Sequence, residues 1–305
     1  MCFSFRRLGE ELILAANNLL SQAQLALLDP LLEPAYLRHA LINKPLPLRL
    51  PPSPRKKALL IGLRYLGRKW PGTEESMELN GSHNDLQRWR RSLLQCGYLD
   101  EDIRILSDKD GVSSGSLDYP SHENILREMQ ALTTDSQDHQ RRFLVFCGHR
   151  KGQKDDGSDS AILGADIENP ISDEDIEACL LHPLAKLSFL TCCRVGNMFS
   201  FDWRVDEAGF LRPALRRRTN GQPILARVLV IGACLRNQRA REVTASGICY
   251  GALTYFPTQR LDERQGGFGL RSFLRETNSY PGLQESEQEI LATCTEVIHK
   301  PWFYP

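Results

Sequence analysis

Two short apolar segments of the sequence each end in a side chain that could take part in covalent catalysis. Residues 143–149, FLVFCGH, end at His149, and residues 187–193, LSFLTCC, end at Cys193. Each segment predicts a buried parallel strand of about five residues. In open α/β sheets, reactive groups gather at the carboxyl ends of the strands. A histidine at one strand end and a cysteine at another therefore predict a cysteine nucleophile with a histidine as its base.

The composition gives no sign of a special partner outside these segments. The chain has 305 residues, of which 41% are hydrophobic and 25% charged, as in ordinary globular proteins. Its 38 basic and 38 acidic residues cancel, so neither nucleic acid nor a membrane surface is an expected partner. No apolar run reaches the roughly 18 residues of a membrane span. Residues 1–7 also lack the apolar core of a signal peptide.

Nine cysteines lie along the chain, at positions 2, 96, 147, 179, 192, 193, 234, 249 and 294. An odd count without a visible export signal favours a reduced compartment over a disulfide framework. We therefore expect a cytoplasmic protein, with the nucleus as the alternative. Because no CxxC pair occurs, we expect no structural zinc site. Most of these cysteines are interpreted as small buried hydrophobic residues.

The first 54 residues differ in pattern from the rest of the chain. Leucines recur at helical spacing over residues 8–28, which predicts an amphipathic helix. Five prolines between Pro45 and Pro54 then indicate an extended linker. We interpret residues 1–54 as an N-terminal extension, whose helix either packs against the main domain or binds a partner.

Strands and helices alternate from residue 55 onward. Strands are predicted at residues 57–63, 103–106, 143–147, 187–190 and 228–234, and helices at about 81–96, 121–132, 172–181, 247–255 and 269–277. Ser121 and Ser172 each precede an acidic first turn, a pattern typical of helix N-caps. Such alternation predicts an α/β fold with a mostly parallel sheet covered by helices on both faces.

Two connections are predicted to be long polar loops. One spans residues 151–169 and is rich in aspartate. The other spans residues 199–223 and carries Arg212 and the basic run that ends at Arg218. An arginine run is usually a solvated surface, but in a peptidase it is also a candidate cleavage site.

Six short motifs occur in the order that is found in one family of enzymes. They are residues 57–62 (KALLIG), 79–85 (LNGSHND), 146–149 (FCGH), 190–193 (LTCC), 232–238 (GACLRNQ) and 251–255 (GALTY). In this order the chain resembles the metacaspases, the caspase-fold cysteine peptidases of fungi, plants and protists, over about residues 55–280. Within this family the chain most resembles the type I members. The resemblance implies a fungal protein with a divergent active-site motif.

The resemblance implies a caspase-like three-layer sandwich with a mostly parallel central sheet and helices on both faces. The part like a large subunit would span about residues 55–205. A basic loop at about 206–223 would lead into the part like a small subunit, at about 224–305. The whole caspase-like domain would thus occupy residues 55–305.

The resemblance also assigns catalytic roles. His149 takes the position of the family's catalytic histidine, and Cys193 takes that of the nucleophile, with Cys192 where the family has serine. The backbone N–H groups of Cys193 and Arg150 would form the oxyanion hole. The family has glycine in place of Arg150, and an arginine cannot cheaply adopt a positive φ.

The substrate pocket implied by the resemblance is altered. Metacaspases hold a P1 Arg or Lys with two aspartates, of which Asp85 matches the first. Thr191 replaces the second. A guanidinium that faces one carboxylate instead of two loses a charge-assisted hydrogen bond, on the order of 1.5–3 kcal/mol. We therefore expect weaker binding of basic P1 residues, or a different preference.

Calcium is the one cofactor that the resemblance suggests. Asp159, Asp173 and Glu174 match carboxylates that bind calcium in the family, and calcium prefers six to eight oxygen ligands. A helix N-cap and a solvated loop would explain the same residues.

Two functions are compatible with these residues. The first is a cysteine endopeptidase that uses Cys193 and His149, acts on peptides or proteins, and processes itself between Arg212 and Arg218. The second is a catalytically impaired pseudoenzyme that acts through binding. For either function we expect a monomer, with a dimer as the alternative.

Overall fold

The computed structural model describes most of the region after residue 55. Described are residues 56–134, 140–151, 161–184, 189–194 (backbone only), 201, 203–205, 211–213, 226–234, 238, 240–264, 268–284, 290–294 and 302–303. All of them belong to one structural unit, Pro54–Pro305. The extension predicted at residues 1–54 lies outside the described residues.

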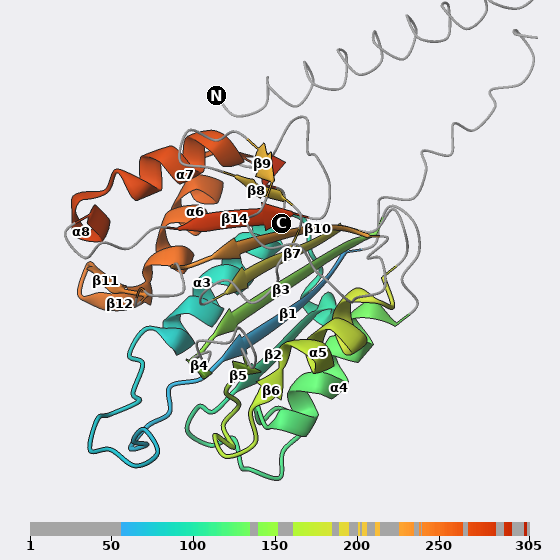
Figure 1. Ribbon diagram of the computed structural model, residues 1–305, viewed down its shortest axis with the longest axis vertical. Coiled ribbons are helices and arrows are strands. Elements are labelled where there is room, and N and C mark those ends of the chain that lie inside the picture. Colours follow the sequence, from blue (N-terminus) through green and yellow to red (C-terminus); the bar gives the residue numbers. More distant parts are fainter. Residues whose placement is uncertain are drawn as a thin grey trace, which may run out of the picture. The chain divides into compact units, whose positions relative to one another are not determined.

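An eight-stranded sheet forms the centre of the fold, in the order β2-β1-β3-β7-β10-β14-β8-β9 (Figure 1). Its parallel part consists of β1 (Lys56–Gly62), β2 (Ile103–Ser107), β3 (Arg141–Cys147), β7 (Phe189–Arg194) and β10 (Arg227–Gly232). Three antiparallel strands extend it, namely β14 (Leu291–Cys294), β8 (Trp203–Val205) and β9 (Leu211–Pro213). The mostly parallel sheet that the sequence predicts is therefore confirmed.

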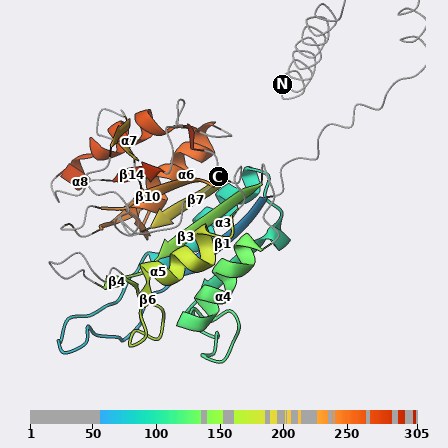
Figure 2. The same cartoon turned by 45° about the vertical axis from the view of Figure 1, so that its right-hand side comes forward.

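Alternate residues of the strands feed two separate hydrophobic cores. On one face, Leu59 and Leu144 pack with residues of α4 (His122–Thr133) and α5 (Asp173–Ile176). On the other face, Leu60 and Val145 pack with residues of α3 (Ser82–Gln95), α6 (Ala252–Arg264) and α7 (Leu270–Asn278). Figure 2 shows α4 and α5 in front of the strands and α3 behind them. Both faces are buried, which explains why these strands are almost uniformly apolar.

The two predicted helix N-caps are present. The side chain of Ser121 accepts a hydrogen bond from the N–H of Asn124 (3.3 Å), where α4 begins. Ser172 and Asp175 form a reciprocal capping box at the start of α5. The predicted helix over 172–181 is accordingly confirmed, although its second half, Glu177–Leu181, is a π-helical turn.

Two boundaries differ from the sequence prediction. Strand β7 continues to Arg194, so Cys193 lies within the strand rather than after its end. The helix predicted at 247–255 is wrong over residues 247–251, because β11 (Glu242–Ala245) and β12 (Ile248–Gly251) form a hairpin there. Only its last part, from residue 252, is helical, as the start of α6. The two turn residues of the hairpin, Ser246 and Gly247, have φ of 53° and 77°, as tight two-residue hairpins require.

The two predicted loops also contain strands. Residues 199–223 include β8 and β9, and Arg212 lies exposed in β9 at the edge of the sheet. Residues 214–225, which include Arg218, lie outside the described residues. In the other loop, β5 (Ala161–Ile162) pairs with β4 (Arg150–Lys151) and β6 (Ile171–Ser172). Edge pairing supplies main-chain hydrogen bonds that residue composition does not reveal.

Short elements complete the described part of the domain. They are a 3₁₀ turn (Asp100–Asp102), α8 (Pro281–Gln284), β13 (Phe268–Gly269) and β15 (Trp302–Phe303). Within the described ranges, no helix has the length and apolar character to span a bilayer.

Candidate active site

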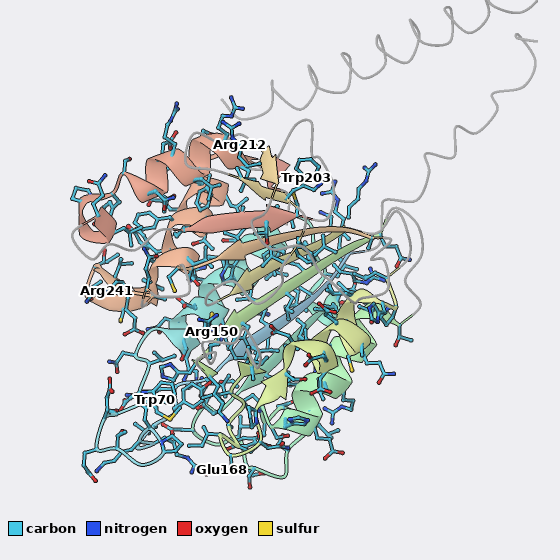
Figure 3. All side chains as sticks on the ribbon, viewed as in Figure 1. Trp70, Arg150, Glu168, Trp203, Arg212 and Arg241 are labelled. Carbon is cyan, nitrogen blue, oxygen red and sulfur yellow. The ribbon has the colours of Figure 1, made fainter. Side chains whose placement is uncertain are left out.

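His149 lies just beyond the end of β3, on the loop that leads into β4. The intervening Gly148 is closely surrounded, since a Cβ there would lie 2.8 Å from the ring of Phe146 and 2.9 Å from the phenol of Tyr65. Only glycine fits this approach. Figure 3 labels Arg150, Trp70 and Arg241 toward the end of the sheet where the parallel strands β1 and β3 finish. The predicted histidine therefore occupies the edge at which α/β folds carry their chemistry.

The imidazole ring of His149 is held by main-chain and aromatic contacts. Its Nε2 lies 2.6 Å from the carbonyl oxygen of Met77. A carbonyl only accepts hydrogen bonds, so Nε2 carries the proton and Nδ1 of the neutral ring has the lone pair. Tyr65 and Trp70 flank the ring at centroid distances of 4.9 and 4.8 Å. The sequence analysis did not find these three partners, all of which lie in the loop after β1.

Burial lowers the pKa of His149 from its ordinary value. The hydrogen bond to Met77 and the carboxylates of Glu242 and Glu75 act in the opposite direction and offset part of this effect. The pKa still lies below that of a free histidine, so His149 is mainly neutral at pH 7. A neutral imidazole with a free lone pair can act as a general base.

The strand register places Thr191 and Cys193 relative to the rest of the site. Cys193 is paired with Val145 of β3 and with Ile231 of β10, and Thr191 is paired with Phe143. Because residues alternate between the faces of a sheet, positions 191 and 193 fall on the same face as Val145. Their side chains lie outside the described part of the chain.

A pocket opens on this same face of the sheet, at the ends of the strands. Its walls include Asp85, Val145, Cys147, Glu242, Gly251 and Thr254. Gly148, the residue before His149, also lines it. Two of its wall residues neighbour the positions that the sequence assigns to catalysis, since Val145 is paired with Cys193 and Gly148 precedes His149. The pocket also contains the predicted pocket residue Asp85.

Asp85 is a buried carboxyl group at the start of α3, with only 4% of its surface exposed. Burial raises its pKa to about 8. Hydrogen bonds from the N–H of Gly251 (3.0 Å), from Thr254 and from Cys147 lower this pKa, while Glu242 raises it further. With no cation in the pocket, Asp85 is therefore largely protonated at neutral pH.

Glu242 is a pocket residue that the sequence analysis missed. Its Oε1 accepts a hydrogen bond from the N–H of Gly81 (2.5 Å), and its charge influences both Asp85 and His149. It was missed because residues 247–255 were predicted to be helical. The Ser246-Gly247 pair is a recognised turn signal and could have indicated the hairpin that carries Glu242.

Arg150 replaces the family glycine without backbone strain. Among the described non-glycine residues, only Tyr65 and Ser246 have a positive φ. Arg150 instead lies in β4, opposite Ile162. The adjacent ladder hydrogen bond runs from the N–H of Leu163 to the carbonyl of His149 (3.0 Å) rather than from the Arg150 amide. The conformational cost that the sequence suggested for this substitution therefore does not arise.

The candidate calcium ligands are only partly within the described residues. Asp173 and Glu174 form the first turn of α5, where the capping box already gives the sequence a structural role. Across the ranges that the structure describes, no three His, Cys, Asp or Glu side chains form a group that could hold a metal ion. Asp159 lies outside them. Two adjacent carboxylates fall short of the six to eight oxygens that calcium prefers.

Comparison with known proteins agrees with this arrangement. Residues 56–200 match the family model described as the metacaspase, peptidase C14 domain. This match, together with the curated relatives, supports a member of the metacaspase family. Metacaspase-1A of Neurospora crassa is 32% identical over 189 residues, which cover 58% of this chain and 39% of that protein. Metacaspase-2 of Trypanosoma brucei brucei is 28% identical over 207 residues, which cover 63% and 57% of the two chains.

The family match supports a caspase-like cysteine peptidase domain. The chain spans less than half the length of the Neurospora relative. Among solved structures, a protein from Geobacter sulfurreducens has a TM-score of 0.54 and 14% identity, covering 80% of this chain and 95% of its own. Its likeness concerns the fold alone. Together with the observed layers, the family match identifies the caspase-like α/β sandwich that the sequence predicts.

The buried carboxyl of Asp85 predicts that the protein becomes less stable as pH rises. Its folded pKa of about 8 lies above the ordinary value of 3.8, so the folded state binds more protons than the unfolded state between these values. The free energy of unfolding should fall through this window, by up to about 1.4 kcal/mol per pH unit. Asp85→Asn should remove this contribution, which urea unfolding at several pH values between about pH 5 and 8 would measure.

Asp110→Asn serves as the matched control, because Asp110 is exposed. Its stability profile should follow that of the unmodified protein. If the stability of the unmodified protein and that of Asp85→Asn changed with pH in parallel, the raised pKa of Asp85 would be contradicted.

Proposed function

We propose that this protein is a cysteine endopeptidase in which Cys193 is the nucleophile and His149 is the general acid and base. One observation carries the proposal. The register pairs Cys193 with Val145, a wall residue of the pocket, and His149 follows that same strand just past its end. This register supports a site in which the nucleophile, the base and a substrate pocket share one edge of the sheet.

The contacts of His149 suit it to both proton transfers. With Nε2–H directed to the Met77 carbonyl, the lone pair of Nδ1 would accept the proton of the Cys193 thiol. The thiolate would attack the scissile carbonyl, and the resulting imidazolium would protonate the leaving amine. Water, deprotonated by the same histidine, would then release the acyl group from the sulfur.

The oxyanion of the tetrahedral intermediate would be held by the N–H groups of Cys193 and Arg150. Each such donor is worth about 3 kcal/mol in comparable acyl-transfer enzymes. The extended backbone of Arg150 supports this role, since no unusual conformation is required of the arginine.

We propose that the pocket takes a basic P1 side chain, more weakly than a pocket with two buried aspartates would. A guanidinium or ammonium group entering it would favour ionised Asp85, which is protonated in the empty pocket. Glu242 would add a second, exposed carboxylate near the rim. Its contribution is reduced by solvent screening, so it replaces only part of the charge missing at Thr191.

Calcium remains a proposed cofactor through Asp159, Asp173 and Glu174. The carboxylates among the described residues do not by themselves form a calcium site. The proposed catalytic steps therefore do not require the ion. Running the peptidase assay below with and without added calcium tests this proposal directly.

The dyad predicts a specific pattern of inactivation. Cys193→Ala and His149→Ala should each reduce the cleavage of Arg- or Lys-containing peptides to background, because each removes a group that forms or breaks a bond. Cys192→Ala is the matched control, since Cys192 is adjacent in β7 and falls on the opposite face of the sheet. Peptide cleavage followed by chromatography would measure the rates.

Loss of activity in Cys192→Ala but not in Cys193→Ala would contradict the assignment of the nucleophile. If the unmodified protein cleaves no peptide while a thiol probe still labels Cys193, a caspase-fold pseudoenzyme that acts through binding becomes the better proposal.

Self-processing between Arg212 and Arg218 is part of the proposal. Cleavage after Arg212 would require β9 to leave β8, because a protease binds its substrate as an unpaired extended chain. The basic run that ends at Arg218, which follows β9 in the sequence, is the other candidate target. Cleavage there that persists in Cys193→Ala would show that another enzyme is responsible.

The pocket predicts that binding of a basic P1 residue strengthens as pH rises toward about 8. Below that pH, binding must release the proton of Asp85, so affinity should rise by up to about tenfold per unit. Asp85→Asn should remove this dependence and weaken binding roughly 10- to 100-fold. Calorimetry on Cys193→Ala backgrounds would measure binding without turnover.

A peptide with a neutral P1 residue is the control, and its binding should be unaffected by Asp85→Asn. Glu242→Gln should cause a smaller loss for the basic peptide only, since Glu242 is exposed. Equal losses for both peptides would contradict a charge-selective pocket.

A further inference from the structure

Tyr65 has an unusual backbone conformation beside the candidate active site. It follows β1 and has a φ of 54°, in the left-handed region that bulky residues rarely occupy. Such a conformation is sterically strained in an L-residue with a large side chain. Only 2% of the residue is exposed, so solvent exposure does not explain it. A strained residue beside a reactive group suggests a functional role.

The carboxylate of Asp108 holds Tyr65 in this conformation. It accepts hydrogen bonds from the N–H groups of Arg64 (2.8 Å) and Tyr65 (2.8 Å), and it is paired with Nε2 of His83 (2.7 Å). Burial alone would raise the pKa of Asp108, but these three partners together lower it below its ordinary value. The carboxylate is therefore ionised throughout the neutral range.

The side chain of Tyr65 contacts His149 in two ways. Its phenol oxygen accepts a hydrogen bond from the N–H of His149 (3.0 Å) and donates one to the carbonyl of Leu163 (2.6 Å). Its ring lies 4.9 Å from the imidazole, at an interplanar angle of 31°. One side chain thus fixes the main chain of His149 and restricts the orientation of its ring. It also links the histidine to Leu163, the residue directly after β5.

We propose that Tyr65 is a positioning residue for His149 and that Asp108 acts through it. The inference rests on the proposed role of His149 in catalysis. In this arrangement, the hydrogen bonds to Asp108 compensate the backbone strain of Tyr65. The phenol of Tyr65 fixes the position of the main chain of His149 where the chain leaves β3. Small errors in such placement are costly, because about 1 Å of displacement can reduce a rate roughly 100-fold.

Tyr65→Phe keeps the ring but removes both hydrogen bonds. Water should then reach the N–H of His149 and reduce the desolvation of its ring. Glu75 and Glu242, whose charges act on His149, would favour the imidazolium. The pKa of His149 should therefore rise toward its ordinary value.

The fluorescence of Trp70 offers a measurement of this ionisation that is independent of catalysis. Its ring is 4.8 Å from that of His149, and a protonated imidazole quenches indole emission at contact. Subtracting the emission of a Trp70→Phe counterpart isolates the Trp70 signal from those of the other tryptophans. A pH titration of this difference then gives the midpoint of His149.

Tyr65→Phe should shift this midpoint upward and reduce kcat for peptide cleavage by roughly tenfold or more, with little change in KM. Tyr98→Phe is the matched control, because Tyr98 is also buried (3% exposed) and its hydroxyl has no hydrogen-bond partner among the residues that the structure describes. The control should change neither the midpoint nor kcat. Asp108→Asn replaces one of the two acceptor oxygens with an NH2 donor, so at least one of the N–H and imidazole partners loses its acceptor. This variant should reproduce the shift of Tyr65→Phe.

An unchanged midpoint in both folded variants would overturn the proposal, as would an equal shift in Tyr98→Phe. Should one variant fail to fold, the other decides the question. If the unmodified protein has no peptidase activity, the proposed function fails, while the fluorescence titration still tests the positioning of His149.

Discussion

The parallel pairing of β3 with β7 is the constraint on which the rest of the site depends. It sets Cys193 level with Val145 and leaves His149 just past the strand end, beside the pocket. A slip of one residue in this register would move every position of β7 to the other face of the sheet. The strands on either side of β7 contribute residues to two buried cores, one on each face, so a change in their pairing would disturb both cores. The register that keeps the cores intact is therefore also the register that places the proposed nucleophile, Cys193.

The pocket contains a group whose burial is unfavourable for the stability of the fold, unlike the apolar residues of the surrounding sheet. A carboxyl group with a pKa of about 8 is kept at Asp85, although burial opposes its ionisation. Hydrogen bonds from Gly251, Thr254 and Cys147 compensate only part of the desolvation. Functional sites commonly retain such unfavourable groups at the expense of stability. The backbone strain at Tyr65, a short distance away, is a second example within the same site.

The sequence predicts the parts of this molecule whose cause is local or periodic. Apolar runs identify the buried strands β1, β3 and β10, and the serine caps identify α4 and α5. Conversely, β8, β9 and β14 form because a neighbouring strand provides hydrogen bonds, and no local pattern records that. The same limitation hid Glu242, which reaches the pocket only because Ser246 and Gly247 turn the chain into a hairpin. Contacts between residues far apart in sequence account for most of what could not be predicted.

Main-chain atoms form many of the contacts that orient the site. The side chains around it can therefore differ from the family pattern without changing those contacts. Met77 holds the imidazole through a carbonyl, while Gly251 and Gly81 hold the pocket carboxylates of Asp85 and Glu242 through N–H groups. Such contacts survive any substitution that keeps the backbone path. Arg150 follows an extended path that glycine would also accept, so the change from glycine preserves the local geometry. Thr191 differs in kind, because there the missing group is a side-chain charge that no backbone atom can replace. Divergence from the family pattern should therefore affect the choice of substrate before it affects the orientation of His149.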